Sequence, residues 1–115
     1  MANITNLEFI TGFSKGNMER VRKYVQMFLE ASEEGRLAIE KAHADKDWKT
    51  LKTAAHTLKS ISGYMGMTDT QNLLKKMEEN AATEKQLDDM PNDVSLLRQH
   101  LQQAEEGLNG FLAQN

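Results

Sequence analysis

Apolar residues recur at alternating spacings of three and four along most of the chain, which is the pattern of helices that bury one face. The first long stripe consists of Met18, Val21, Val25, Phe28, Ser32, Gly35, Ile39 and Ala42. It predicts one long helix, with Asn17 placed to cap its N-terminus. Ser32 and Gly35 interrupt the apolar residues, so we expect a neighbouring helix to approach closely there.

A second stripe follows the polar run 44–47, with Trp48 near its start. Its inward positions are Leu51, Ala54, Leu58, Ile61 and Met65. Gly66 is placed to end this helix in the left-handed conformation. The residues 68–71, Thr-Asp-Thr-Gln, fit a capping box that opens a third helix. That helix turns Leu73, Leu74 and Met77 inward.

A polar connection over about 82–90 separates the third helix from a last one, which we expect to start at Pro91. Its stripe consists of Val94, Leu97, Leu101, Ala104, Leu108 and Phe111. Near the N-terminus, Leu7, Phe9 and Ile10 predict a short additional helix. Four amphipathic helices with short connections predict an all-α fold, an antiparallel up-and-down four-helix bundle with the short N-terminal helix added. One domain would span residues 1–115.

Composition excludes several classes of protein. The chain has 115 residues, no Cys and a net charge of -3, so a disulfide scaffold and a cysteine zinc site are excluded. No apolar run approaches the length of a membrane span, and no glycine-rich phosphate loop is present. Mild acidity argues against nucleic acid as a partner. The first residues, 1–6, lack the features of a signal peptide, so we expect a cytoplasmic location without membrane attachment.

His56 stands on the polar side of the second helix. At about 100° per residue, Lys52, Lys59, Ser60 and Gly63 fall within about 60° of it, and the apolar stripe lies opposite. Glycine inside a helix costs about 1 kcal/mol against alanine, and a solvent-facing glycine gains nothing from core packing. We therefore interpret Ser60 and Gly63 as clearance through which a second macromolecule approaches the imidazole.

An outward imidazole beside lysines has a definite chemistry. Neutral imidazole is a nucleophile near neutral pH, and it carries a dianionic group once it is phosphorylated. Lys59, one turn on, is placed to neutralise that charge, with Lys52 as a second candidate. A surface histidine beside lysines is more often only part of a solvated face, and His43 and His100 are given that interpretation. His56 is singled out by the combination with Lys59 and the small residues that follow.

The stretch 56–66 resembles the signature of histidine-containing phosphotransfer (HPt) domains. It matches at His56, at the apolar Leu58, at Lys59 and at the final Gly66, whereas Ser60 stands where the family usually has glycine. The resemblance covers nearly the whole chain, because the number and spacing of helices also agree. It implies a four-helix-bundle intermediate of a two-component phosphorelay.

The resemblance implies a role for each matching residue. His56 would accept a phosphoryl group on Nε2 from the aspartate of a response-regulator receiver domain and pass it to another receiver. Glu78, 22 positions after His56, would orient the ring by accepting a hydrogen bond from Nδ1–H. Lys59, and Lys52 beside it, would stabilise the phosphoryl group. The docking surface would comprise Ser60, Gly63, Tyr64, Gly66 and Met67.

This carrier would bind no ATP, no cofactor and no metal of its own, because Mg²⁺ belongs to the receiver. We expect a monomer. Two alternatives stay open: Glu78 is also compatible with a solvated helix charge, and the bundle with a helical adaptor whose His56 is never phosphorylated. A metal or haem bundle is disfavoured because His56 faces outward. The sequence identifies neither the kinase nor the receivers, nor the direction of phosphoryl flow, and it fits both a free-standing protein and a domain of a larger sensor.

Overall fold

The computed structural model describes residues 17–114, and this part of the chain is helical with no strand. It contains α2 (Met18–Asp45), α3 (Trp48–Tyr64), α4 (Thr68–Thr83) and α5 (Met90–Gln114), with the 3-10 turn η1 (Leu87–Asp89) before α5. The predicted N-terminal helix with Leu7, Phe9 and Ile10 lies outside the described residues.

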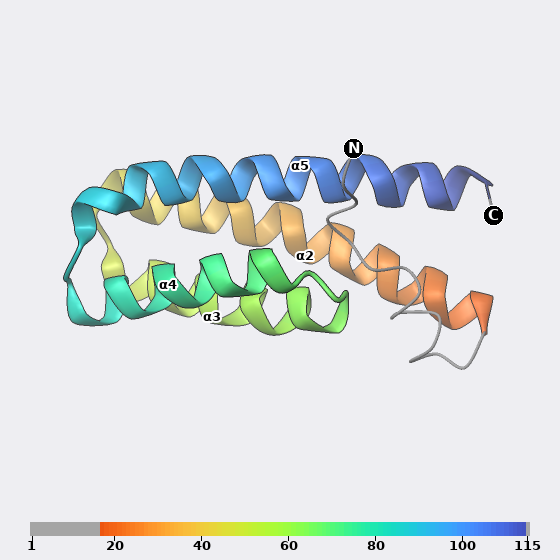
Figure 1. The fold of residues 1–115 in the computed structure, drawn as a ribbon, viewed down its shortest axis with the longest axis horizontal. Coiled ribbons are helices and arrows are strands. Elements are labelled where there is room, and N and C mark those ends of the chain that lie inside the picture. Colours follow the sequence, from red (N-terminus) through yellow and green to blue (C-terminus); the bar gives the residue numbers. More distant parts are fainter. Residues whose placement is uncertain (1–16, 115) are drawn as a thin grey trace.

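Successive helices run in alternate directions (Figure 1), as the short connections between them require. Each helix packs against two others, so that α2 contacts α3 and α5, and α4 contacts α3 and α5. The predicted antiparallel up-and-down four-helix bundle is therefore confirmed. The shorter α3 and α4 lie side by side as one pair, and the longer α2 and α5 extend beyond them.

The predicted apolar stripes form most of the core of this bundle. In α3 the buried face is shifted slightly, because Ala54 and Ile61 are only half-buried and the next residues, Ala55 and Ser62, are buried instead. The largest fully buried side chains come from all four helices: Phe28, Ile39, Leu51, Leu58, Met65, Met67, Leu74, Met77, Met90, Leu97 and Leu101. Met18, the first member of the long stripe, is exposed instead, because it lies in the first turn of α2. Burial of this many apolar side chains, each worth about 1.5–3 kcal/mol, is the main force that holds the helices together.

Local signals fix the ends of α2 and α3. Asn17 caps α2 as predicted, since its side-chain oxygen accepts from the Arg20 N–H at 3.0 Å. Asp47 caps α3 in the same way, by accepting from the Thr50 N–H at 3.1 Å. Gly66 has a φ of 68°, which confirms the left-handed turn after α3. These caps hold α3, and the histidine it carries, in one register.

The predicted capping box at 68–71 is wrong. Helix α4 already begins at Thr68, its N-cap residue is Met67, and no side chain caps it. The physical reason is that Met67 is fully buried directly after the Gly66 turn. Apolar packing of Met67, rather than a hydroxyl cap, therefore sets where the chain enters α4.

Small residues let α2 approach its neighbours closely, as expected. A Cβ atom added to Gly35 would lie 3.2 Å from Leu58 Cδ2 on α3. The hydroxyl of buried Ser32 donates to Glu105 Oε1 on α5 at 3.0 Å. Gly35 therefore sets how closely α2 packs against α3, the helix that carries His56, and Ser32 joins α2 to α5.

Candidate functional site

His56 lies in the middle of α3 and points outward, with 61% of its side chain exposed. Its chain neighbours explain this orientation. Ala55 is buried and Leu58 is packed in the core, so the helix cannot rotate to bury the imidazole. The predicted exposure of His56 is therefore confirmed.

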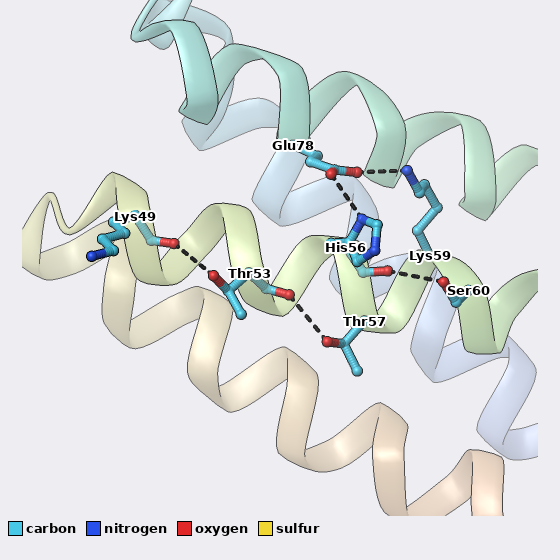
Figure 2. Close-up of polar contacts among 7 residues, drawn as sticks. All are labelled: Lys49, Thr53, His56, Thr57, Lys59, Ser60 and Glu78. Carbon is cyan, nitrogen blue, oxygen red and sulfur yellow. Dashed lines mark hydrogen bonds and ion pairs between the residues drawn. The ribbon is translucent and has the colours of Figure 1, made fainter.

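Glu78 on α4 links His56 to Lys59. Its Oε2 lies 2.9 Å from His56 Nδ1, and its Oε1 accepts from Lys59 Nζ at 2.6 Å. Figure 2 shows the carboxylate between the two side chains of α3. One carboxylate thus contacts both residues on which the sequence motif depends, and the predicted proximity of Glu78 to His56 is confirmed.

The charge of Glu78 decides the tautomer of His56. The ion pair with Lys59, and secondarily the contact with His56, hold the pKa of Glu78 below its usual range, although partial burial opposes this. An ionised carboxylate can only accept hydrogen bonds, so whenever the imidazole is neutral its proton lies on Nδ1. Nε2 therefore keeps its lone pair on a largely exposed ring.

The other residues on the His56 side make local contacts. Ser60 Oγ donates to the His56 carbonyl oxygen at 3.4 Å, so its hydroxyl bonds to the backbone rather than to the imidazole (Figure 2). Lys52 is exposed, and within residues 17–114 it makes no hydrogen bond or ion pair to His56 or Glu78. Of the two lysines considered, only Lys59 is thus joined to the site.

The interpretation of Gly63 as solvent-facing clearance is wrong. Gly63 is half-buried against α4, and a Cβ atom added there would lie 2.6 Å from Gln71 Nε2. The physical reason is that α3 packs against both α2 and α4, so α4 covers the part of the polar side where Gly63 lies. The absence of a side chain at Gly63 leaves room for the Gln71 amide of α4.

The five expected docking residues do not share one environment. Tyr64 is 66% exposed, and Ser60 is exposed as well. Met67 is fully buried, so its predicted place on an exposed docking surface is wrong. Gly66 serves the left-handed turn that ends α3. Only Ser60 and Tyr64 therefore offer side chains to a partner along α3.

An apolar groove of about 430 Å³ between α2 and α3 was not predicted. Its lining residues are Tyr24, Met27, Phe28, Ala31, Ile61, Tyr64 and Met65. Met27 and Tyr64 are strongly exposed although they are large and apolar. Both lie off the apolar stripes of their helices, which is the sequence signal that could have found this groove.

The two other histidines are half-buried, so the interpretation of His43 and His100 as part of a solvated face is wrong. The ring of His43 lies 6.3 Å from the ring of Trp48, at the corner between α2 and α3. His100 Nδ1 lies 2.9 Å from Thr70 Oγ1, and burial lowers the pKa of His100. Neither histidine has a neighbouring lysine and carboxylate arranged as at His56.

Among residues 17–114, no group of three or more His, Asp or Glu side chains could hold a metal ion. Glu40 and His43 have a spacing found in metal-binding bundles, but Glu40 instead pairs with Arg36 at 3.1 Å and with Arg98 at 3.7 Å. In the same part of the chain, no helix has the length and apolar character needed to cross a membrane.

Known proteins share this fold. The crystal structure of the HPT domain from the Hpt sensor hybrid histidine kinase of Shewanella superposes with a TM-score of 0.85 at 20% identity, covering 98% of this chain and 97% of that chain. Histidine-containing phosphotransfer protein B of Pseudomonas aeruginosa PAO1 gives a TM-score of 0.89 at 17% identity, covering 100% and 99%. Comparison with curated protein sequences gave no match.

The family model described as the Hpt domain matches residues 23–107, a range that includes α3, α4 and the His56–Glu78 contact. This chain belongs to the Hpt domain family. Its role is therefore phosphotransfer in two-component signalling, as a carrier rather than a kinase.

Proposed function

We propose that His56 is the phosphorylated residue of this carrier, and that it takes the phosphoryl group on Nε2 from a receiver-domain aspartate and returns it to a second receiver. The observation that carries the proposal is the contact of 2.9 Å between His56 Nδ1 and Glu78 Oε2. It leaves Nε2 as the nucleophilic nitrogen on an exposed ring.

The transfer step follows from this arrangement. The Nε2 lone pair attacks the phosphorus of the aspartyl phosphate in line, the acyl P–O bond breaks, and the aspartate leaves as a carboxylate. The ring becomes positively charged while Nδ1 keeps its proton, and Glu78 stabilises that charge at 2.9 Å. Transfer to the second receiver reverses these bonds.

The partner completes the chemistry. Mg²⁺ bound in the receiver supplies charge neutralisation around the transferred group, so this chain needs no metal, cofactor or ATP of its own. Lys59, paired with Glu78 at 2.6 Å, is the cation that this chain would contribute to the phosphoryl group. Lys52, exposed one turn before His56, adds positive charge to the same face.

We place the receiver over the exposed side of α3. Ser60 and Tyr64 follow His56 along this side. Tyr64 also lines the apolar groove, together with exposed Met27. A groove of this kind suits an apolar helix of a receiver. The net charge of -3 supports a protein partner rather than nucleic acid, and we propose that the domain works as a cytoplasmic monomer.

The direct test is transfer of radiolabelled phosphate from a phosphorylated receiver in the presence of Mg²⁺. The expected label on this chain is stable to base, labile to acid and absent in His56→Gln. His43→Gln is the matched control and should be labelled like the unmodified chain, since His43 contacts Trp48 away from Glu78. Binding of receivers without any label would instead identify a helical adaptor.

A further inference from the structure

Lys59 already forms an ion pair in the unphosphorylated protein. Its ammonium lies 2.6 Å from Glu78 Oε1, a shorter contact than the 2.9 Å between His56 Nδ1 and Glu78 Oε2. The ion pair is also the less exposed part of the site, with 24% of the Lys59 side chain and 17% of the Glu78 side chain exposed, against 61% for His56. Lys59 is therefore not a free cation, and it can bind a phosphoryl group only by changing its ion pair with Glu78.

Phosphorylation changes the number of charges in the site. Before transfer, the site holds one cation and one anion, Lys59 and Glu78, and the imidazole has to be neutral for Nε2 to act as the nucleophile. After transfer, the phosphoryl group adds a charge of about −1.5 to −2, and the ring with its proton on Nδ1 becomes a second cation. Two cations and two anions can then form a different set of ion pairs.

We propose that phosphorylation of His56 exchanges the partner of Lys59, so that the Lys59 ammonium leaves Glu78 for the phosphoryl oxygens on Nε2 and Glu78 becomes the counterion of the phosphorylated ring. This inference rests on the proposed function and names a positioning switch within the same site. No covalent bond beyond the N–P bond changes, and Nδ1 keeps its proton throughout.

The geometry supports the exchange. Lys59 lies one turn after His56 on α3, and its flexible stem carries three donors that can turn toward either anion without movement of the helix. The more highly charged phosphoryl group attracts the ammonium more strongly than Glu78 does. Glu78, released by Lys59, keeps its other oxygen on Nδ1–H and supports the positive ring.

The test uses the full chain phosphorylated by phosphoramidate, a small donor that does not require a receiver. The ¹⁵N signal of the Lys59 ammonium should shift on phosphorylation and gain a scalar coupling to ³¹P. The Lys76 ammonium is the matched control, because Lys76 pairs with Asp93 at 3.3 Å and should not respond. A phosphohistidine signal with an unshifted, uncoupled Lys59 would overturn the exchange and leave the proposed function standing. Failure of His56 to become phosphorylated would contradict both.

A double-mutant cycle gives an independent measurement. We expect Lys59→Gln to lower the equilibrium share of phosphoryl group on this chain, relative to a receiver, by about two- to fivefold. In a Glu78→Gln background the loss should be larger, because Lys59 then gives up no partner when it binds the phosphoryl group. If Lys59 acts only by holding Glu78, its effect instead disappears in that background, and the exchange is ruled out.

Discussion

At the scale of single residues, Glu78 is the side chain on which we propose that the reactivity of His56 depends. Lys59 holds the pKa of its carboxylate below the usual range, so the carboxylate stays ionised to more acidic pH than an isolated glutamate and favours the proton of a neutral imidazole on Nδ1. An orienting carboxylate of this kind also stabilises the positive charge that develops on the ring during transfer. Three side chains thus form the site: His56 and Lys59 from α3, and Glu78 from α4.

Replacing Glu78 should slow phosphotransfer without changing the fold. We expect Glu78→Ala to lower the rate of transfer from a phosphorylated receiver by about 10- to 100-fold, the usual cost of losing an orienting partner. Glu78→Gln should lose less, since an amide oxygen can still accept from Nδ1–H. Rapid-quench measurement of the labelled fraction gives both rates, and an unchanged rate in Glu78→Ala would exclude the orienting role.

The same carboxylate should make stability depend on pH. The pKa of Glu78 is lower in the folded protein than the ordinary value of 4.5, so its contribution is complete above about pH 4.5 and is lost as the pH falls through the lower folded value. For a partly exposed ion pair we expect about 0.5–1 kcal/mol.

Urea unfolding of the unmodified chain and of Glu78→Gln, from pH 7 to pH 2.5, measures this contribution. The unmodified chain should be the more stable at pH 7, and the difference should vanish at the acid end. A difference that persists unchanged at pH 2.5 would mean that the charge of Glu78 is not its source.

At the scale of the helices, the α3–α4 pair builds the site. Helix α3 contacts both α2 and α4, and the His56 side is therefore open to solvent only in part. The periodicity of one helix predicts its inward stripe, but it does not show how many neighbours that helix has. The sequence therefore predicted where α3 begins and ends, but it wrongly placed Gly63 and Met67 on an exposed surface. Gly63 lies against Gln71, and Met67 is fully buried.

The seating of α3 on α2 should be sensitive to the size of residue 35. A Cβ atom at Gly35 would lie 3.2 Å from Leu58 Cδ2, so Gly35→Leu should overpack the interface and cost about 1–3 kcal/mol. Gly110→Leu is the matched control, because a Cβ atom there has no neighbour within 4 Å. It should stabilise α5 by about 0.5 kcal/mol through the loss of a helical glycine.

Chemical denaturation of both leucine variants, followed by circular dichroism, compares them directly. If Gly35→Leu were as stable as Gly110→Leu, the close approach of α2 to α3 would not be a constraint on the bundle.

For the whole molecule, the bundle serves as a rigid support for one outward histidine. The core comes from all four helices, whereas the polar groups of the site come only from α3 and α4. The chain as a whole carries a net charge of -3, yet lysines lie on both sides of His56 along α3. This distribution suits a protein that meets acidic phosphorylated partners locally without attracting polyanions in general.

The sequence predicted those features that depend on residues close together along the chain. The apolar periodicity and the residues around His56 are local, and they predicted the bundle and the candidate nucleophile. The Lys59–Glu78 ion pair depends on the relative register of α3 and α4, which is set by packing of residues such as Met67 and Met77. That register cannot be read from either helix alone, so Lys59 was expected to face a phosphoryl group directly.

The position of the phosphoryl group on the phosphorylated chain shows directly whether Nε2 of His56 is the nucleophile. We expect ³¹P and two-bond ¹H–¹⁵N spectra to show one phosphohistidine, at His56, with phosphorus on Nε2 and the proton on Nδ1 facing Glu78. Phosphorus on Nδ1, or on a residue other than His56, would contradict the account.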